Sequence, residues 1–305
     1  MKVDTQKQTE AGGWRNVLKR TFVEFREDNM TDWAAALTYY GVLSIFPALI
    51  AVVSVVGLIG QSATDPLLEN LGKFAPGAAR DILENALNGL ARSRGGAGIL
   101  FFVGIAGSIW AASGYVGAFM RAANTIWDVP EGRSVWKVVP LRIGVTVVML
   151  VLLAVSATAV VLTGGLADAA GKLVGVGGAA VTVWDIAKWP ILVIVVSVMF
   201  GILYYASPNV RQPGFRWVTP GGLVAVVLWI AASGVFALYV SAFGSYNKTY
   251  GSLGAIIIFL VWLWISNIAI LLGAELNAEL QRGRQIEAGH PVEQEPFLPP
   301  RDEAA

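Results

Sequence analysis

Two carboxylates and an amide close the stretch LLGAELNAEL at residues 271–280, after a long run without charge. Glu275 and Glu279 are four residues apart, so on a helix they share one face, where like charges destabilise by a few tenths of a kcal/mol. Carboxylates near the C-terminal end of a helix also oppose its macrodipole, by roughly 0.3–1 kcal/mol. These acids therefore need cations nearby, and Arg282 follows Glu279 by about one helical turn.

The cation for Glu275 is expected to come from another segment, because none follows it before Arg282. Arg142 and Arg216 flank other apolar runs and should end at a similar depth, and Asp32 is the matching acid at the start of the first run. Two interpretations stay open. These groups form a ring of ion pairs that locks a helix bundle, or they contact the charged head group of a bound molecule.

The composition indicates an integral membrane protein. The chain has 305 residues, of which 55% are hydrophobic and 14% charged, and its mean hydropathy is +0.62. A soluble domain carries about 25% charged residues. There is no cysteine and one histidine, His290, which excludes disulfides, thiolate metal sites and histidine-based triads. We therefore expect no cofactor and no metal, and the net charge of +1 predicts no nucleic-acid partner.

Six uncharged segments are long enough to cross a bilayer, which takes about 20 apolar residues as a helix. The predicted fold is all-α: an integral membrane protein with six transmembrane helices plus an amphipathic helical extracytoplasmic loop. We expect a cytoplasmic N-terminal segment at 1–31, the six-helix domain at 32–281 and a disordered cytoplasmic tail at 282–305. The spans lie at about 33–60, 97–119, 143–167, 189–207, 217–243 and 250–274, with the loop at 61–96.

Some residues in these spans are expected to shape the bundle. Pro47 lies in the middle of the first span and cannot donate a backbone hydrogen bond, so it should kink that helix. Gly104, Ser108 and Ala112 follow one another at four-residue spacing in the second span. Such small faces let helix backbones approach closely.

The basic residues predict the orientation. Most Lys and Arg residues fall on the side of the predicted bundle that carries both termini. The positive-inside rule places that side in the cytoplasm.

The span interiors contain only neutral polar groups. This argues against proton or sodium coupling through a buried carboxylate, which ion-coupled transporters usually place near the midplane. It fits a client that is itself amphipathic, with an apolar body in the membrane and a polar head at the rim. The neutral groups are Thr38, Tyr39, Tyr40, Ser44, Ser113, Tyr204, Tyr205 and Asn267.

Taken together, several stretches resemble the YihY/virulence factor BrkB family of bacterial inner-membrane proteins, over about residues 15–285. They are DNMTDWAAALTYYGVLSIFPALI at 28–50, RAANTIWDVPEGRSVWK at 121–137 and SYNKTYGSLGAIIIFLVWLWISNIAILLGAELNAEL at 245–280, with YYASPNV and TPGGLVAVVLW between them. The resemblance implies a multi-pass protein of the bacterial plasma (inner) membrane. Members have been labelled ribonuclease BN or linked to envelope integrity, serum resistance and lipid or lipopolysaccharide export.

The resemblance also implies site residues. Gly251 and Gly254 precede most of the last span, where they let the chain turn tightly. No metal-ligand cluster and no acid/base set beside a basic groove supports the nuclease label, so we expect no enzyme. The positions carried over as candidate substrate contacts are Asp32, Tyr39, Tyr40, Asn124, Arg133, Tyr250, Glu275, Asn277 and Glu279.

The function predicted is binding or translocation of an amphipathic lipid or envelope precursor, with membrane lipids as partners. The alternative is a scaffold or assembly partner for another envelope protein. No G-x-x-x-x-G-K-[ST] motif is present, so the sequence predicts no nucleotide binding of this kind. The sequence leaves open which lipid is bound, the direction, the energy source and the oligomeric state.

Overall fold

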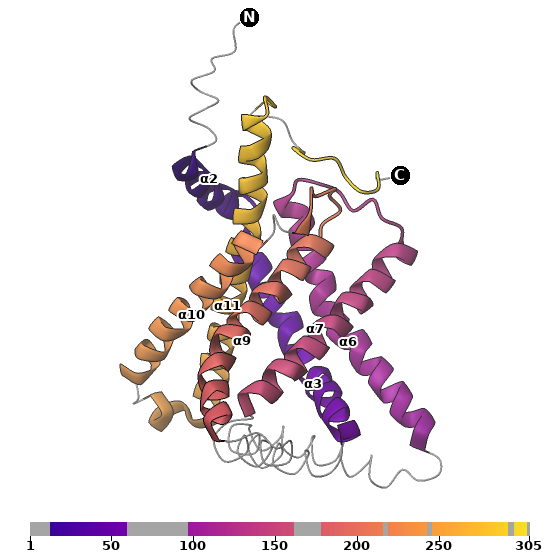
Figure 1. Cartoon of the computed structure of the whole chain (residues 1–305), viewed down its shortest axis with the longest axis vertical. Helices are drawn as coiled ribbons and strands as arrows, with labels where there is room; N and C mark the ends of the chain where they lie inside the picture. Colours follow the sequence, from indigo (N-terminus) through magenta and orange to yellow (C-terminus); the bar gives the residue numbers. More distant parts are fainter. Residues whose placement is uncertain are drawn as a thin grey trace, which may run out of the picture. The chain divides into compact units, whose positions relative to one another are not determined.

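The computed structural model describes residues 13–59, 97–161, 178–215, 219–242, 246–291 and 296–303 (Figure 1). Most of these residues are helical, and the single β-pairing among them is an isolated bridge between Val210 and Pro300. The helices are α2 (Trp14–Glu27), α3 (Met30–Ile59), α6 (Ala97–Ile126), α7 (Val135–Val161), α9 (Gly178–Ala206), α10 (Thr219–Ala242) and α11 (Tyr246–Glu287).

Every predicted span overlaps a helix, and four of these helices are long and apolar enough to cross a membrane. The four stretches are Val135–Val160, Val181–Ala206, Pro220–Val240 and Ile256–Glu287. The six-span count stays a prediction, and the amphipathic loop predicted at 61–96 lies outside the described residues. The N-terminal helix α2 was not predicted.

Two helices extend well past the predicted spans, because a helix does not end where charge begins. The fourth span was predicted from 189, yet α9 begins at Gly178 and includes Asp185 and Lys188. These two pair one turn apart, with 2.8 Å between Lys188 Nζ and Asp185 Oδ1, so neither charge opposes the helix. The last span was predicted to end near 274, and α11 continues to Glu287.

The tail at 282–305 differs from the disordered segment expected from its acids and prolines. Residues 282–287 belong to α11, and Phe297 and Leu298 are buried. The ring of Phe297 lies 5.3 Å from that of Trp127, measured between centroids. Two adjacent apolar residues therefore anchor a segment whose average composition is polar.

Two helix ends carry residues in the left-handed region. Asn29, between α2 and α3, has φ 53°, and Asp128, just after α6, has φ 50°. Asn and Asp adopt this conformation more readily than other non-glycine residues. Pro130 follows Asp128 in the sequence and cannot continue a helix, so α6 stops there.

The chain divides into two compact units. The first contains Met1–Gly41, Tyr115–Arg142 and Val196–Ala305, and the second contains Val42–Gly114 and Ile143–Val195. The first unit therefore holds the start of α3, the end of α6, the start of α7, the end of α9, and all of α10 and α11.

Within the first unit, hydrogen bonds from Asn267 join α11 to α3 and α6. Asn267 Nδ2 donates to Thr38 Oγ1 at 3.1 Å, and Tyr115 Oη donates to Asn267 Oδ1 at 2.8 Å. Both ends of the amide are satisfied in a place with little water. Such bonds add to the packing that holds membrane helices together.

Further bonds join α11 to α9 and α10. Tyr204 Oη donates to the carbonyl oxygen of Ile270 at 2.6 Å. Trp262 Nε1 donates to Ser233 Oγ at 3.1 Å, and Trp229 Nε1 donates to Ser266 Oγ at 3.0 Å. Uncharged hydrogen-bonding groups of α11, four side chains and the Ile270 carbonyl, thus contact four other helices.

Helices α10 and α11 cross at glycines, with almost no space between their backbones. A Cβ atom on Gly221 would lie 2.3 Å from the carbonyl oxygen of Gly273, and one on Gly273 would lie 2.6 Å from the Cβ of Ala225. Real Cβ atoms do not approach other atoms this closely, so side chains larger than hydrogen are excluded at both positions.

This crossing gives the first prediction. Gly221→Ala is expected to destabilise the protein by about 1–3 kcal/mol, because overpacking forces a backbone shift. Gly234→Ala is the matched control in the same helix, since a Cβ at Gly234 would meet nothing within 4 Å. It should be neutral or stabilising by up to about 1 kcal/mol. Thermal unfolding in detergent measures both, and equal effects would contradict the close crossing.

Candidate functional site

The two acids of the LLGAELNAEL stretch are buried, Glu275 with 1% and Glu279 with 2% of its surface exposed. Glu279 is paired with Arg20 of α2 through Oε2, and its Oε1 lies 3.5 Å from Arg282 Nη1. The expectation that Arg282 serves Glu279 is confirmed. Arg282 Nη1 also lies 2.9 Å from Glu24 Oε1, so two cross-helix ion pairs hold α2 against α11. Together with Glu275, these charged residues of α2 and α11 form the first cluster.

Glu275 has a different environment. Its Oε2 accepts no hydrogen bond within the described part of the chain. The charged groups that act on it most strongly are also carboxylates, led by Asp28 and Glu279. A buried carboxylate without a cation is unfavourable, because desolvation of its charge is not offset.

No described residue forms an ion pair with Glu275, so Arg142 does not supply the cation that was predicted for it. The Arg142 side chain lies instead against Gly117, where an added Cβ would be 2.9 Å from its Cδ. The side chain of Arg216 lies outside the described residues.

The burial of these acids also corrects a second expectation. The sequence placed both acids at the rim of the bundle, beyond the last predicted span. In the structure α11 continues to Glu287, so Glu275 and Glu279 lie within a helix and are buried. The argument against coupling concerns carboxylates near the membrane midplane, and it stays a prediction.

Asn277 joins the two helices that cross at glycines. Its Oδ1 accepts a hydrogen bond of 2.9 Å from the backbone N–H of Gly221. Gly221 lies in the first turn of α10, where backbone N–H groups have no partner within their own helix. Asn277 therefore supplies from α11 a cap that α10 lacks.

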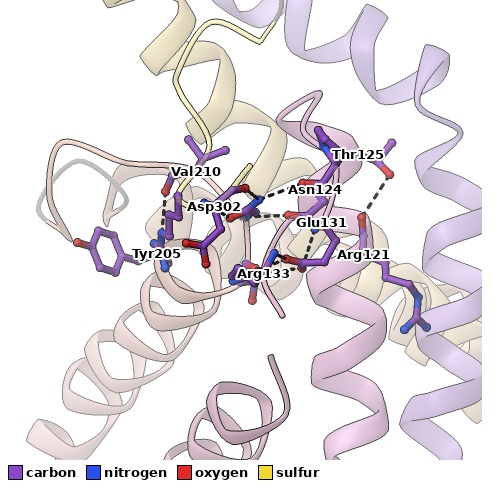
Figure 2. Close-up of polar contacts among 12 residues, drawn as sticks. Arg121, Asn124, Thr125, Glu131, Arg133, Tyr205, Val210 and Asp302 are labelled. Atoms are coloured by element: carbon purple, nitrogen blue, oxygen red, sulfur yellow. Dashed lines mark hydrogen bonds and ion pairs between the residues drawn. The ribbon is translucent and has the colours of Figure 1, made fainter. Parts of the chain in front are cut away.

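A second cluster lies in the loops after α6 and α9 (Figure 2). Glu131 and Arg133 point toward one another, with Arg133 Nε 2.7 Å from Glu131 Oε1 and Nη2 2.6 Å from Oε2. The backbone N–H of Arg133 also donates to Glu131 Oε1 at 3.0 Å. Arg133 Nη2 donates at 2.8 Å to the carbonyl oxygen of Ser207, which ties the loop to the end of α9.

Two asparagines extend this cluster. Asn124 Nδ2 donates to Glu131 Oε2 at 3.1 Å, and Asn124 Oδ1 accepts from the backbone N–H of Asn209 at 2.8 Å. The Asn209 side chain donates to the carbonyl oxygen of Asp302 at 2.8 Å and accepts from the N–H of Asp302 at 3.1 Å. The Asn209 side chain thus holds the segment 296–303 through both its donor and its acceptor.

Arg301 fixes the same segment from the other side. Its Nε donates to the carbonyl oxygen of Val210 at 2.8 Å and its Nη2 to that of Tyr205 at 2.6 Å. Burial, with the charge of Arg133 adding to it, lowers the pKa of the Arg301 guanidinium. At the exposed edge, Lys137 Nζ lies 2.9 Å from Asp302 Oδ2.

The pKa of Glu131 shows which protonation state the second cluster favours. Burial alone would raise the pKa of Glu131, but the hydrogen bonds and charge of Arg133, together with Asn124, hold it below its ordinary value. The ionised pair is thus the favoured state of these loops.

The predicted site residues fall into two groups and several outliers. Asn124 and Arg133 meet in the second cluster, and Glu275 and Glu279 lie in the first. Asp32 is exposed in the first turn of α3, where a carboxylate complements the helix dipole. Tyr39 is exposed and makes an edge contact with Tyr40, and Arg121 lies over the ring of Tyr40 at 5.7 Å.

Among the residues predicted to be structural, Ala112 and Gly254 are buried, and Pro47 lies within α3. The side chains of Pro47, Gly104, Ser108, Tyr250 and Gly251 lie outside the described residues. Four contributors were missed by sequence reasoning: Glu131, Asn209, Arg20 and Glu24. Glu131 and Asn209 stand in the DVPEGRS and YYASPNV stretches, and a helical periodicity in residues 14–27 would have indicated the other two.

The described residues contain no group of three or more acidic, histidine or cysteine side chains that could hold a metal ion. The first cluster consists instead of paired carboxylates and guanidinium groups around one unpaired carboxylate oxygen. Arg282 connects the clusters, since its guanidinium lies 5.9 Å from the ring of Phe297, which packs on Trp127.

A family profile described as "Virulence factor BrkB" matches residues 21–296, which include all of the second cluster's loops and the acids of α11. The chain belongs to the virulence factor BrkB family. The resemblance stated from its motifs is confirmed. For this BrkB-family chain, membership in a family of membrane proteins agrees with the four apolar helices.

Relatives within the family carry different names. A "Putative ribonuclease-like protein YfkH" from Bacillus subtilis is 32% identical over 274 residues, covering 90% of this chain and 98% of that protein. A "UPF0761 membrane protein" from Alkalilimnicola ehrlichii is 30% identical over 269 residues, covering 84% of this chain and 56% of that protein. The chain thus spans about half the length of the Alkalilimnicola relative. No solved structure matches the chain.

The second cluster gives a prediction about stability. Glu131→Gln should destabilise the protein by about 1–3 kcal/mol, because it weakens a hydrogen-bonded partner of a buried guanidinium. The value is below that for a fully buried pair because 34% of the Glu131 side chain is exposed, against 4% for Arg133. Thermal unfolding measures the difference.

The pH dependence tests the cause. Because the folded-state pKa of Glu131 is lowered, its contribution is present above the ordinary carboxyl pKa and is lost as pH falls through the folded value. The gap between wild type and Glu131→Gln should therefore close in acid. Lys137→Gln, which removes the exposed pair with Asp302, is the control and should change stability by no more than about 1 kcal/mol. A gap that stays constant with pH would contradict the ionic origin.

Proposed function

We propose that this chain binds an amphipathic lipid or envelope precursor and carries it within or across the membrane, with the polar head group meeting Glu275. The observation that carries the proposal is the buried Glu275 carboxylate, whose Oε2 accepts no hydrogen bond within the described residues. Such an oxygen suits a head group that donates a hydrogen bond or carries an ammonium group.

The apolar surroundings support the same proposal. Both α10 and the apolar part of α11 expose large hydrophobic side chains, among them Leu223, Val235, Leu238, Ile256 and Ile257. These surfaces suit acyl chains, while the carboxylates lie toward the polar end of α11. A molecule with an apolar body and a polar head therefore matches the distribution of side chains along this helix.

Access to Glu275 is controlled by α2. Asp28 follows α2 directly and is the strongest charged neighbour of Glu275, while Glu24 and Arg20 of α2 are held by Arg282 and Glu279. Displacing α2 would break these two ion pairs and uncover the carboxylate. A head group that entered here would replace contacts that α2 makes.

A nuclease is not part of the proposal. The word ribonuclease comes from the name of the Bacillus relative. Glu24, Glu131 and Glu279 are already paired with arginine, whereas phosphodiester hydrolysis calls for a metal or a positioned acid and base.

The experiment is native mass spectrometry of the protein extracted with its surrounding membrane, beside a Glu275→Gln variant. Wild type is expected to retain a defined lipid that the variant loses. Glu287→Gln is the matched control, because Glu287 is an exposed carboxylate of the same helix. An identical bulk-lipid profile in all three would overturn the proposal, and a co-purifying protein without lipid would favour a scaffold.

Unfolding measurements on the same variants separate binding from structure. Glu275→Gln should leave stability unchanged or raise it, since it removes a buried charge that has no cation. Glu279→Gln should lower stability by about 3–5 kcal/mol, because it leaves Arg20 and Arg282 without their buried partner. Destabilisation by Glu275→Gln of the same size would show that Glu275 is a structural ion-pair residue.

A further inference from the structure

Helix α2 has three distinct faces. Val17, Thr21 and Phe25 are buried at four-residue spacing, and α2 packs on α11 within the first unit (Figure 1). This face, together with the ion pairs of Arg20 and Glu24, accounts for the attachment of the helix to the protein. The remaining surface of α2 points away from α11.

An apolar stripe runs along that remaining surface. Trp14, Leu18 and Phe22 follow one another at four-residue spacing and are 58%, 47% and 62% exposed. Three large hydrophobic side chains on one stripe of a short helix are costly to leave in water, at about 25 cal/mol for each Å² of apolar surface. Their exposure on a helix attached to membrane spans calls for a partner.

A basic stripe lies directly beside the apolar one. Arg15, Lys19 and Arg26 are exposed, and at 100° per residue they fall on the adjoining strip of the helix surface. The exposed acid of α2, Glu27, lies on the far side of this strip. Apolar side chains bordered by Lys and Arg are typical of helices that lie in the plane of a membrane interface.

We propose that α2 lies in the membrane interface, with Leu18 and Phe22 of the apolar stripe among the acyl chains, Trp14 at the level of the head groups, and the basic stripe (Arg15, Lys19, Arg26) on anionic lipid phosphates. Charge complementarity decides the occupant: three cations and an aromatic pair fit an anionic leaflet, in which tryptophan settles at head-group depth. Continuity supports it, since α2 leads through Asn29 directly into the apolar helix α3.

A position in the membrane interface also explains why the charged residues of α2 lie on two different faces of the helix. Arg20 and Glu24 face α11 and form its ion pairs, whereas the cations of the basic stripe are exposed on another face. Long basic side chains reach from a partly inserted helix to the phosphate level. The helix therefore binds protein with one face and lipid with another.

The test uses the full chain, which contains no cysteine, in lipid nanodiscs. Leu18→Cys and Phe22→Cys each carry an environment-sensitive fluorophore, and nitroxide-labelled lipids act as quenchers. Glu27→Cys is the matched control on the same helix. In phosphatidylglycerol discs the labels at 18 and 22 are expected to be quenched at least about threefold more than the label at 27, because only they lie among acyl chains.

Charge provides the second arm. The triple variant Arg15→Gln, Lys19→Gln, Arg26→Gln should weaken docking by about fivefold per cation, and neutral phosphatidylcholine discs or added salt should act in the same direction. Equal quenching at 18 and 27 would overturn the proposal. Quenching that stays the same in the triple variant, in neutral discs and in salt would also overturn it. A label that lipid quenchers cannot reach, and that becomes exposed to solvent on dilution, would show that a second copy or another protein covers the stripe.

Discussion

Hydrogen bonds between neutral side chains of α11 and its neighbours are the interaction on which the first unit depends. In lipid, apolar burial drives helix association only weakly, because acyl chains are as apolar as leucine. Asn267 bonds to α3 and α6, Ile270 accepts from α9, and the Trp–Ser pairs join α10. Asn267 would lose both of its side-chain partners if α3 and α6 moved away. The arrangement of helices is therefore specified by directional contacts made by one helix.

Ionic contacts have a different place and purpose. They gather where the helices leave the apolar region, and each of the two clusters fastens a segment outside the spans. Glu279 and Arg282 hold α2, and the Glu131–Arg133 loops hold residues 296–303 through Asn209. Glu275 departs from this pattern, because it lies beside these ion pairs and takes part in none of those described. Buried polar groups without a partner are where natural proteins often depart from local rules for the sake of function.

The sequence predicted the apolar helices well and the polar contacts poorly. Uninterrupted hydrophobic runs mark helices directly, so each of the predicted spans coincides with one. Helix ends were less predictable, since the Asp185–Lys188 pair and the acids of α11 continue helices that charge was expected to stop. Asn124 and Arg133 were predicted separately as candidate substrate contacts, and their common partner Glu131 comes from a turn whose geometry no spacing reveals. That Arg142 does not pair with Glu275 could not be predicted, because ion pairing between distant segments depends on packing that composition does not encode. The four-residue spacing of the apolar residues of α2 indicates an amphipathic helix. It was overlooked because the N-terminal segment was considered only for its charged residues.

The glycine crossing of α10 and α11 has a mechanical consequence. Two backbones separated by no side chain cannot slide or tilt against one another without collision, and the Asn277 cap at the N-terminal end of α10 fixes their register as well. We therefore expect α10 and α11 to move as one rigid unit. The other partners of α11 contact it through the ends of longer side chains, Tyr115 and Tyr204, whose torsions can turn. We therefore expect relative motion of α11 in the first unit to occur more readily against α6 and α9 than against α10.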